Sequence, residues 1–150
     1  TEVPKQTAKR KAALKPQVEL VKPLHRLLVI DHDKMNNMLI RKMLPEIKQL
    51  DFATHKNELI RNIEMSIRQH QLYEVLILDT NFENPKEGLR WLTKIPQTFS
   101  EYAYTPIIAL SSFPELDEEE DRLIKMGFCA YLAKPLNKER LISSLNICLS

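Results

Sequence analysis

Short runs of consecutive apolar residues constrain the fold of this chain more than any other feature of its sequence. The strong runs are Leu27–Ile30, Val75–Leu78 and Ile107–Leu110, and weaker ones lie near 51–54 and 130–133. Runs of this length that are rich in Val, Ile and Leu are typical of strands buried on both faces. Because parallel strands need crossover connections, five of them with helices between predict an α/β domain with a parallel sheet covered on both sides.

The stretches between these runs carry apolar residues at helical spacing. Three of the predicted helices are marked by Leu39, Ile40, Met43 and Leu44; by Leu59, Ile60, Ile63 and Ile67; and by Leu141, Ile142, Leu145 and Leu149. Asp33 and Asn57 are candidate N-caps for the first two of these, and Pro45 is expected to end the first. The five strands therefore alternate with five helices.

The chain divides by charge into a leader, residues 1–24, and a folded domain, residues 25–150. Residues 1–26 hold seven Lys or Arg against two Glu, with Pro4, Pro16 and Pro23 among them, which favours a solvated linker. The remainder is mildly acidic and indicates no nucleic-acid surface. No apolar run is long enough to span or insert into a membrane, and no signal peptide opens the chain, so we expect a cytoplasmic protein.

Glycine and cysteine usage excludes several classes of site. The two glycines, Gly88 and Gly127, are too few for a P-loop or a dinucleotide-binding loop. The two cysteines, Cys129 and Cys148, form no CxxC pair and no Cys/His cluster, which argues against structural zinc. We interpret them as reduced thiols with no chemistry of their own.

Polar residues follow the strands where each strand is predicted to end. Asp31, His32 and Asp33 follow the first run, Asp79 follows Val75–Leu78, Ser111 follows Ile107–Leu110, and Lys134 follows 130–133. In an open parallel sheet the carboxyl ends of all strands lie at one edge, and ligands bind where the strand order reverses. A helix cap or a turn explains any one of these residues, but all of them together predict a site built of carboxylates, a hydroxyl and an ammonium.

Four blocks of sequence resemble the receiver domain of two-component response regulators, over about residues 25–150. The blocks are Val29 to Asn36, Leu76 to Asp79, Thr105 to Ser112 and Gly127 to Leu136, and their order and spacing agree with that family. The resemblance implies a flavodoxin-like fold with strand order 2-1-3-4-5. The first block is most similar to receivers of hybrid histidine kinases. Together with the leader, the absent initial Met and the end of the chain at Ser150, it favours the carboxy-terminal receiver of such a kinase.

The resemblance also implies the role of each site residue. Asp79 would accept the phosphoryl group, while Asp31, Asp79 and the backbone carbonyl of Asn81 would bind Mg²⁺. Lys134 and Ser111 would contact the phosphoryl oxygens, Tyr131 would turn inward as the switch aromatic, and Pro135 would support them. The surface of the fourth and fifth helices and the fifth strand would then change for a partner.

The implied partners are a histidine kinase or a histidine phosphotransfer domain, with a homodimer through the switching surface as a further option. On this interpretation the domain is a signalling module that assists only its own phosphorylation and dephosphorylation, rather than an enzyme.

Two positions depart from the family pattern. His32 stands where receivers usually have a second metal-binding acid, and Asp33 normally faces away from the metal. Losing one unit of attraction near 4 Å costs roughly 1–4 kcal/mol, so we expect weaker Mg²⁺ binding and a relative preference for Mn²⁺. The loop from Thr80 to Gly88 lacks the usual Met-Pro pair and is one residue longer than usual, which bears on the lifetime of the phosphoryl group.

The sequence is also compatible with two other functions. A degenerate receiver that acts as an interaction module without phosphorylation is supported by His32. A phosphatase of the haloacid-dehalogenase type would use Asp31 as nucleophile and Asp33 as general acid, but it leaves Asp79 and Lys134 unexplained. In both alternatives, unlike in a phosphorylated receiver, Asp79 would not accept a phosphoryl group.

Overall fold

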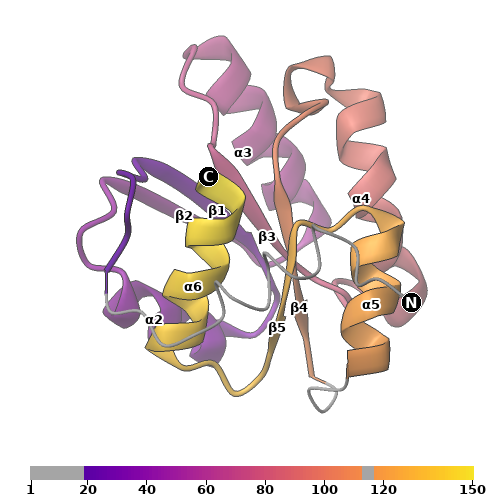
Figure 1. Cartoon of the computed structure of the whole chain (residues 1–150). Helices are drawn as coiled ribbons and strands as arrows, with labels where there is room; N and C mark the ends of the chain where they lie inside the picture. The colour runs from indigo at the N-terminus through magenta and orange to yellow at the C-terminus, as the bar shows by residue number, and fades with distance from the viewer. Residues whose placement is uncertain (1–18, 113–116) are drawn as a thin grey trace.

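The computed structural model describes residues 19–112 and 117–150. Its five strands are β1 (Arg26–Ile30), β2 (Gln49–Ala53), β3 (Val75–Asp79), β4 (Ile107–Ser111) and β5 (Ala130–Ala133). They form one parallel sheet in the order β2-β1-β3-β4-β5 (Figure 1). The predicted fold class and strand order are therefore confirmed.

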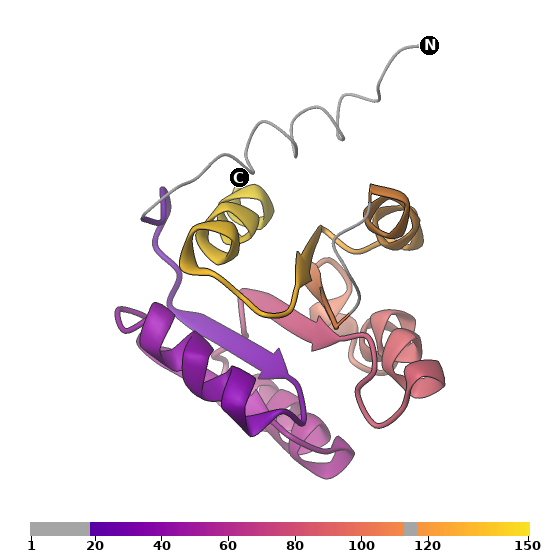
Figure 2. The ribbon, with the colours of Figure 1, turned by 90° about the horizontal axis from the view of Figure 1, so that it is seen from below.

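Helices cover both faces of this sheet. They are α2 (Lys34–Met43), α3 (Lys56–Arg68), α4 (Pro85–Thr98), α5 (Asp117–Met126) and α6 (Lys138–Leu149), with a short 3₁₀ helix at Ser100–Tyr102. Figure 2 shows α2 and α6 on one side of the sheet and α4 and α5 on the other. Among the described residues, no helix combines the length and the apolarity that crossing a bilayer would require.

The core consists of two layers because strand side chains point alternately to the two faces. On one face, Leu28, Ile30, Leu76 and Leu78 pack with residues of α3 and α4. On the other face, Leu27, Val29, Val75 and Ile77 pack with residues of α2 and α6. Both faces of β1 and β3 are apolar for this reason, which is what their unbroken apolar runs predicted.

The helix ends follow local sequence signals, with one exception. Asp33 caps α2 by accepting a hydrogen bond from the backbone N–H of Asn36, as expected, and α2 ends before Pro45. The cap of α3 is His55, whose side chain accepts from the Glu58 N–H. The prediction that Asn57 caps α3 is wrong, since the helix already begins at Lys56.

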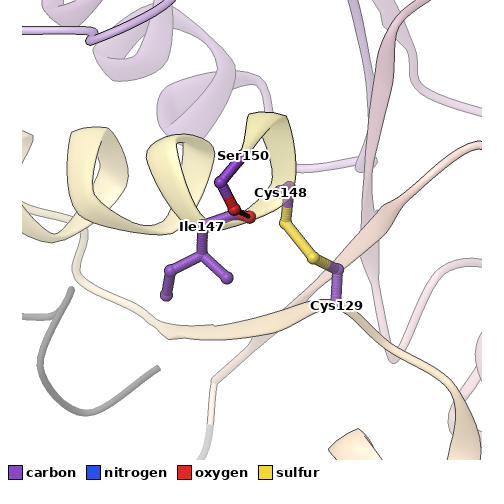
Figure 3. Close-up of a disulfide and its surroundings, with 4 residues drawn as sticks. All are labelled: Cys129, Ile147, Cys148 and Ser150. Carbon is purple, nitrogen blue, oxygen red and sulfur yellow. Dashed lines mark hydrogen bonds between the residues drawn. A yellow bond between two sulfur atoms is a disulfide. The ribbon is translucent and has the colours of Figure 1, made fainter. Parts of the chain in front are cut away.

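The cysteines are joined in a disulfide, Cys129 to Cys148, so the prediction of two reduced thiols is wrong (Figure 3). Cys129 immediately precedes β5, and Cys148 lies in the last turn of α6. Because α6 runs antiparallel to the strands, its end returns to the edge of the sheet where β5 begins. The Cα atoms are 6.0 Å apart, within the usual range for a bridged pair.

Of the predicted leader, residues 1–18 lie outside the described residues. Residues 19–24 run beside α6 before β1 begins, and the Leu24 side chain is buried. Residues 113–116, between β4 and α5, also lie outside the described part of the chain.

Candidate functional site

The carboxyl ends of β1, β3 and β5 bring three charged side chains together. The Nζ atom of Lys134, which follows β5, lies 3.0 Å from Oδ2 of Asp31 and 3.0 Å from Oδ2 of Asp79. Both carboxylates are buried, with side-chain exposures of 0% and 1%. The predicted meeting of these residues at one edge of the sheet is therefore present in the structure.

A hydrogen-bond network fixes the Asp31 carboxylate. Oδ1 accepts from the Asp33 N–H and Oδ2 accepts from Nδ2 of Asn36, both at 3.0 Å. Nδ2 of Asn37 donates to the Asp31 backbone carbonyl at 3.0 Å. The first turn of α2 therefore holds Asp31 in place, and the two asparagines are buried to do so.

The Asp79 carboxylate has a comparable backbone anchor. Its Oδ1 accepts from the Asn81 N–H at 2.7 Å, while Oδ2 faces Lys134. The Thr80 N–H donates to the Leu110 carbonyl at 2.9 Å, which continues the pairing of β3 with β4 past the end of β3. The loop after Asp79 therefore starts in a fixed direction.

Gly88 explains how α4 packs on this loop. A Cβ atom at Gly88 would lie 2.1 Å from the Thr80 carbonyl oxygen and 2.8 Å from the Phe82 nitrogen. Only glycine permits this close approach of helix to backbone. A glycine inside a helix, in a chain with only two glycines, is a sequence signal for such a close approach.

The electrostatics of the site reflect two buried acids that share one ammonium. Burial raises the pKa of Asp31 to about 6, and the neighbouring Asp79 adds to this shift. Burial lowers the pKa of Lys134, but its hydrogen bond to Asp79 and the charge of Asp31 outweigh burial, and the net shift is upward. Asp33 has a lowered pKa because its carboxylate accepts from the Asn36 N–H.

His32 and Asp33 lie at the rim of the site. The His32 side chain is 62% exposed, and its Nδ1 is 3.9 Å from Oδ1 of Asp31. One ligand atom each from Asp31, His32 and Asp79 lies within 4.8 Å of the others, so these three could hold a metal ion. Oδ2 of Asp33 lies 3.6 Å from the Lys134 Nζ and belongs to no such group among the described residues.

Ser111 and Tyr131 occupy the neighbouring strands. Ser111 is fully buried at the end of β4, and its carbonyl accepts from the Lys134 N–H at 2.7 Å. Tyr131, paired with Ala109 in the sheet, is 3% exposed, so its ring already lies in the core in this structure. The Lys134–Pro135 peptide bond is cis.

Comparison with known proteins identifies the family. The family model of the response regulator receiver domain matches residues 27–146. The chain therefore belongs to the response regulator receiver domain family, and it carries an acidic cluster of Asp31 and Asp79. This removes the haloacid-dehalogenase alternative.

Solved structures agree with this family. A two-component response regulator from Clostridium difficile is 26% identical, with a TM-score of 0.64, covering 83% of this chain and 95% of that one. The chemotaxis protein CheY4 of Vibrio cholerae is 20% identical, with a TM-score of 0.65, covering 84% and 99%. A response regulator from Burkholderia pseudomallei is 20% identical, with a TM-score of 0.60, covering 81% and 66%. No curated protein sequence gives a significant match.

Proposed function

We propose that this domain takes a phosphoryl group from a phosphohistidine onto Asp79. The observation that carries the proposal is the contact of the buried Asp79 carboxylate with Lys134, with Asp31 on the other side of the same ammonium. Of the fold neighbours, the Burkholderia pseudomallei protein has a phosphorylated aspartic acid and a calcium ion. Because that protein is only 20% identical to this chain, it supports the proposed phosphorylation only through the shared fold.

The residues of the site fit a divalent cation. Asp31 and Asp79 together carry one more negative charge than Lys134 neutralises, and both are removed from water. Hard cations take oxygen ligands, so Asp31, Asp79 and the Asn81 carbonyl are the groups that would hold Mg²⁺. When bound, the ion would neutralise charge that develops on the phosphoryl oxygens.

The protein groups would divide the remaining work of the transfer. An Asp79 oxygen forms the new bond to phosphorus as the P–N bond of the phosphohistidine breaks, and the departing imidazole takes up a proton. Lys134 already lies at hydrogen-bond distance from Asp79 and would follow the phosphoryl oxygens as charge moves onto them. The Ser111 hydroxyl would bind another of these oxygens, which would couple the site to β4.

The partners follow from this chemistry. A histidine kinase or a histidine phosphotransfer domain would donate the group, and the surface of α5, β5 and α6 would report it through Tyr131. A homodimer through that surface is part of the proposal. The block from Val29 to Asn36 carries the further proposal that the domain belongs to a hybrid kinase. A complete gene that encodes no kinase region upstream of this domain would contradict it.

Intact mass after incubation with acetyl phosphate or phosphoramidate tests the proposal. With Mg²⁺ or Mn²⁺ we expect a gain of one phosphoryl group that is absent in Asp79→Asn and retained in Asp121→Asn, a matched change of an exposed acid on α5. No gain with either metal supports the degenerate receiver instead. A gain that persists in Asp79→Asn refutes Asp79 as the acceptor.

The His32 position allows a sharper test of metal use. Because His32→Asp adds one negative charge at the rim, we expect the Mg²⁺ concentration for half-maximal phosphorylation to fall about tenfold or more. The native protein should prefer Mn²⁺ relative to the variant, since nitrogen suits the softer ion better. Equal Mg²⁺ dependence of the two proteins would contradict this role of His32.

A further inference from the structure

The disulfide closes a covalent ring around β5 and α6. Cys129 begins the ring beside β4, where its N–H donates to the Ile107 carbonyl at 2.8 Å, and Cys148 ends it in the last turn of α6. The ring contains Tyr131 and Lys134. Figure 3 shows the bond spanning from the end of the helix to the start of the strand. The bond therefore fixes the end of α6 that lies farthest from the carboxylates.

The same last turn of α6 holds the segment that precedes β1, residues 19–24, which we call the amino-terminal strap. The Asn146 side chain accepts from the Val21 N–H at 2.9 Å and donates to the Glu19 carbonyl at 3.3 Å. Leu20 packs against the core layer beneath α6. Asn146 and Cys148 are two positions apart, so they point to different sides of the helix. The turn is thus held by the strap on one side and by β5 on the other.

The last turn is less well packed than the rest of the helix. Residues 141–145 of α6 are buried, whereas Asn146 to Leu149 are only half-buried. Cys129 is also half-buried. A helix end with little burial opens locally at a low free-energy cost. The covalent bond therefore adds to the few contacts that keep this turn on β5.

We propose that Cys129 and Cys148 form a reversible thiol–disulfide switch that controls how firmly the amino-terminal strap docks on α6. The oxidant is a low-molecular-weight disulfide, such as oxidised glutathione. One cysteine thiolate attacks a glutathione sulfur and releases the first glutathione thiolate, and the second cysteine then displaces the other glutathione. The protein gives up two electrons and two protons, and two molecules of reduced glutathione are formed.

Reduction reverses these steps and removes the tie to β5. The last turn of α6 then frays more often, and the strap loses the ordered Asn146 side chain that binds its backbone. A reducing cytoplasm would favour this loosened form, and oxidising conditions would favour the tied form. The switch acts at the edge opposite Asp79, so it does not depend on the proposed phosphorylation.

Hydrogen exchange of the whole chain in glutathione buffers tests the proposal. Intact mass should show a reversible loss of two hydrogens in excess oxidised glutathione, without dimer formation. In the reduced form, amides of residues 19–22 and 146–150 should exchange about tenfold faster than in the oxidised form. Amides of β1 and β3 should not change, which distinguishes local opening from loss of the fold.

Two variants separate the bond from the strap. Cys148→Ser should exchange fast in both regions whatever the redox buffer. Asn146→Ala should loosen residues 19–22 while its cysteines still pair. The proposal is overturned if the thiols stay reduced in excess oxidised glutathione, if they pair between molecules, or if oxidised and reduced protein exchange at the same rate.

Discussion

The buried charge of Asp31 makes the stability of the metal-free domain depend on pH in an unusual direction. Its pKa rises from 3.8 to about 6 on folding because the carboxyl is buried beside Asp79. Between these two values the folded protein holds a proton that the unfolded chain has lost. The free energy of unfolding therefore falls as the pH rises through this window.

The size of the effect follows from the shift. Each pKa unit corresponds to 1.36 kcal/mol, so charging Asp31 costs the folded state at most about 3 kcal/mol by pH 7.5. Asp31→Asn removes this charge but weakens the contact with Lys134. We expect a net gain in unfolding free energy of about 1–2 kcal/mol at pH 7.5 and no gain at pH 4.5, where Asp31 is already protonated.

Urea unfolding in the presence of a metal chelator measures the free energy of unfolding at pH 7.5 and at pH 4.5. The matched control is Asp33→Asn, because Asp33 is a rim residue with a lowered pKa and asparagine also caps helices well. The contribution of Asp33 to the free energy of unfolding has the opposite pH dependence, because it is present at neutral pH and is lost as the pH falls. The Asp33→Asn variant should therefore gain no stability at pH 7.5. If Asp31→Asn is destabilised equally at both pH values, desolvation of this carboxylate is not what shifts its pKa.

Two further predictions concern packing. Gly88→Ala places a methyl group 2.1 Å from the Thr80 carbonyl oxygen, so the urea midpoint should fall by the equivalent of about 3 kcal/mol; an unchanged midpoint contradicts the close approach. Tyr102→Phe removes a buried hydroxyl that bonds the Ser66 hydroxyl and should cost about 1–3 kcal/mol of unfolding free energy. Tyr104→Phe, at a side chain that is 98% exposed, should leave the same midpoint unchanged, and equal losses in both variants would argue against the buried bond.

Much of the fold was predictable because its strongest signals are local. The apolar runs of β1, β3 and β4 are unbroken since both faces of these strands are covered, and the polar residue after each run marks the edge where strands end. The edge strand β2 was harder to place, and it begins at Gln49, two residues before the expected Asp51. An edge strand with one half-exposed face carries a weaker apolar pattern.

The sequence predicts that the charged residues of the site lie close together, but it does not predict the hydrogen-bond network that holds them. Asp31, Asp79 and Lys134 follow strands, so the topology alone brings them together. Asn36 and Asn37 turn inward and hold Asp31. This depends on how α2 is rotated about its axis, and the polar character of the two residues does not indicate that rotation. The phosphoryl roles of these residues remain predictions.

Cysteine motifs do not predict this disulfide, because its two cysteines form no recognisable spacing pattern. Cys129 precedes a strand and Cys148 ends the helix that follows it. In a parallel α/β fold, the helix after a strand runs back toward the end of the sheet where the strand began. A residue just before the strand and a residue at the end of the helix therefore lie close together. The topology therefore contained a signal for this contact that spacing rules do not capture.

The contact of Val21 with Asn146 has a consequence for protein engineering. It brings two positions near opposite ends of the chain to the rim of the sheet where the strands start, whereas Asp79 lies at the rim where they finish. A short peptide joining the two neighbourhoods would give a circularly permuted domain with new ends in any exposed loop. For the same reason, the whole unit could be spliced into a surface loop of a host protein with its carboxylates pointing away from the host.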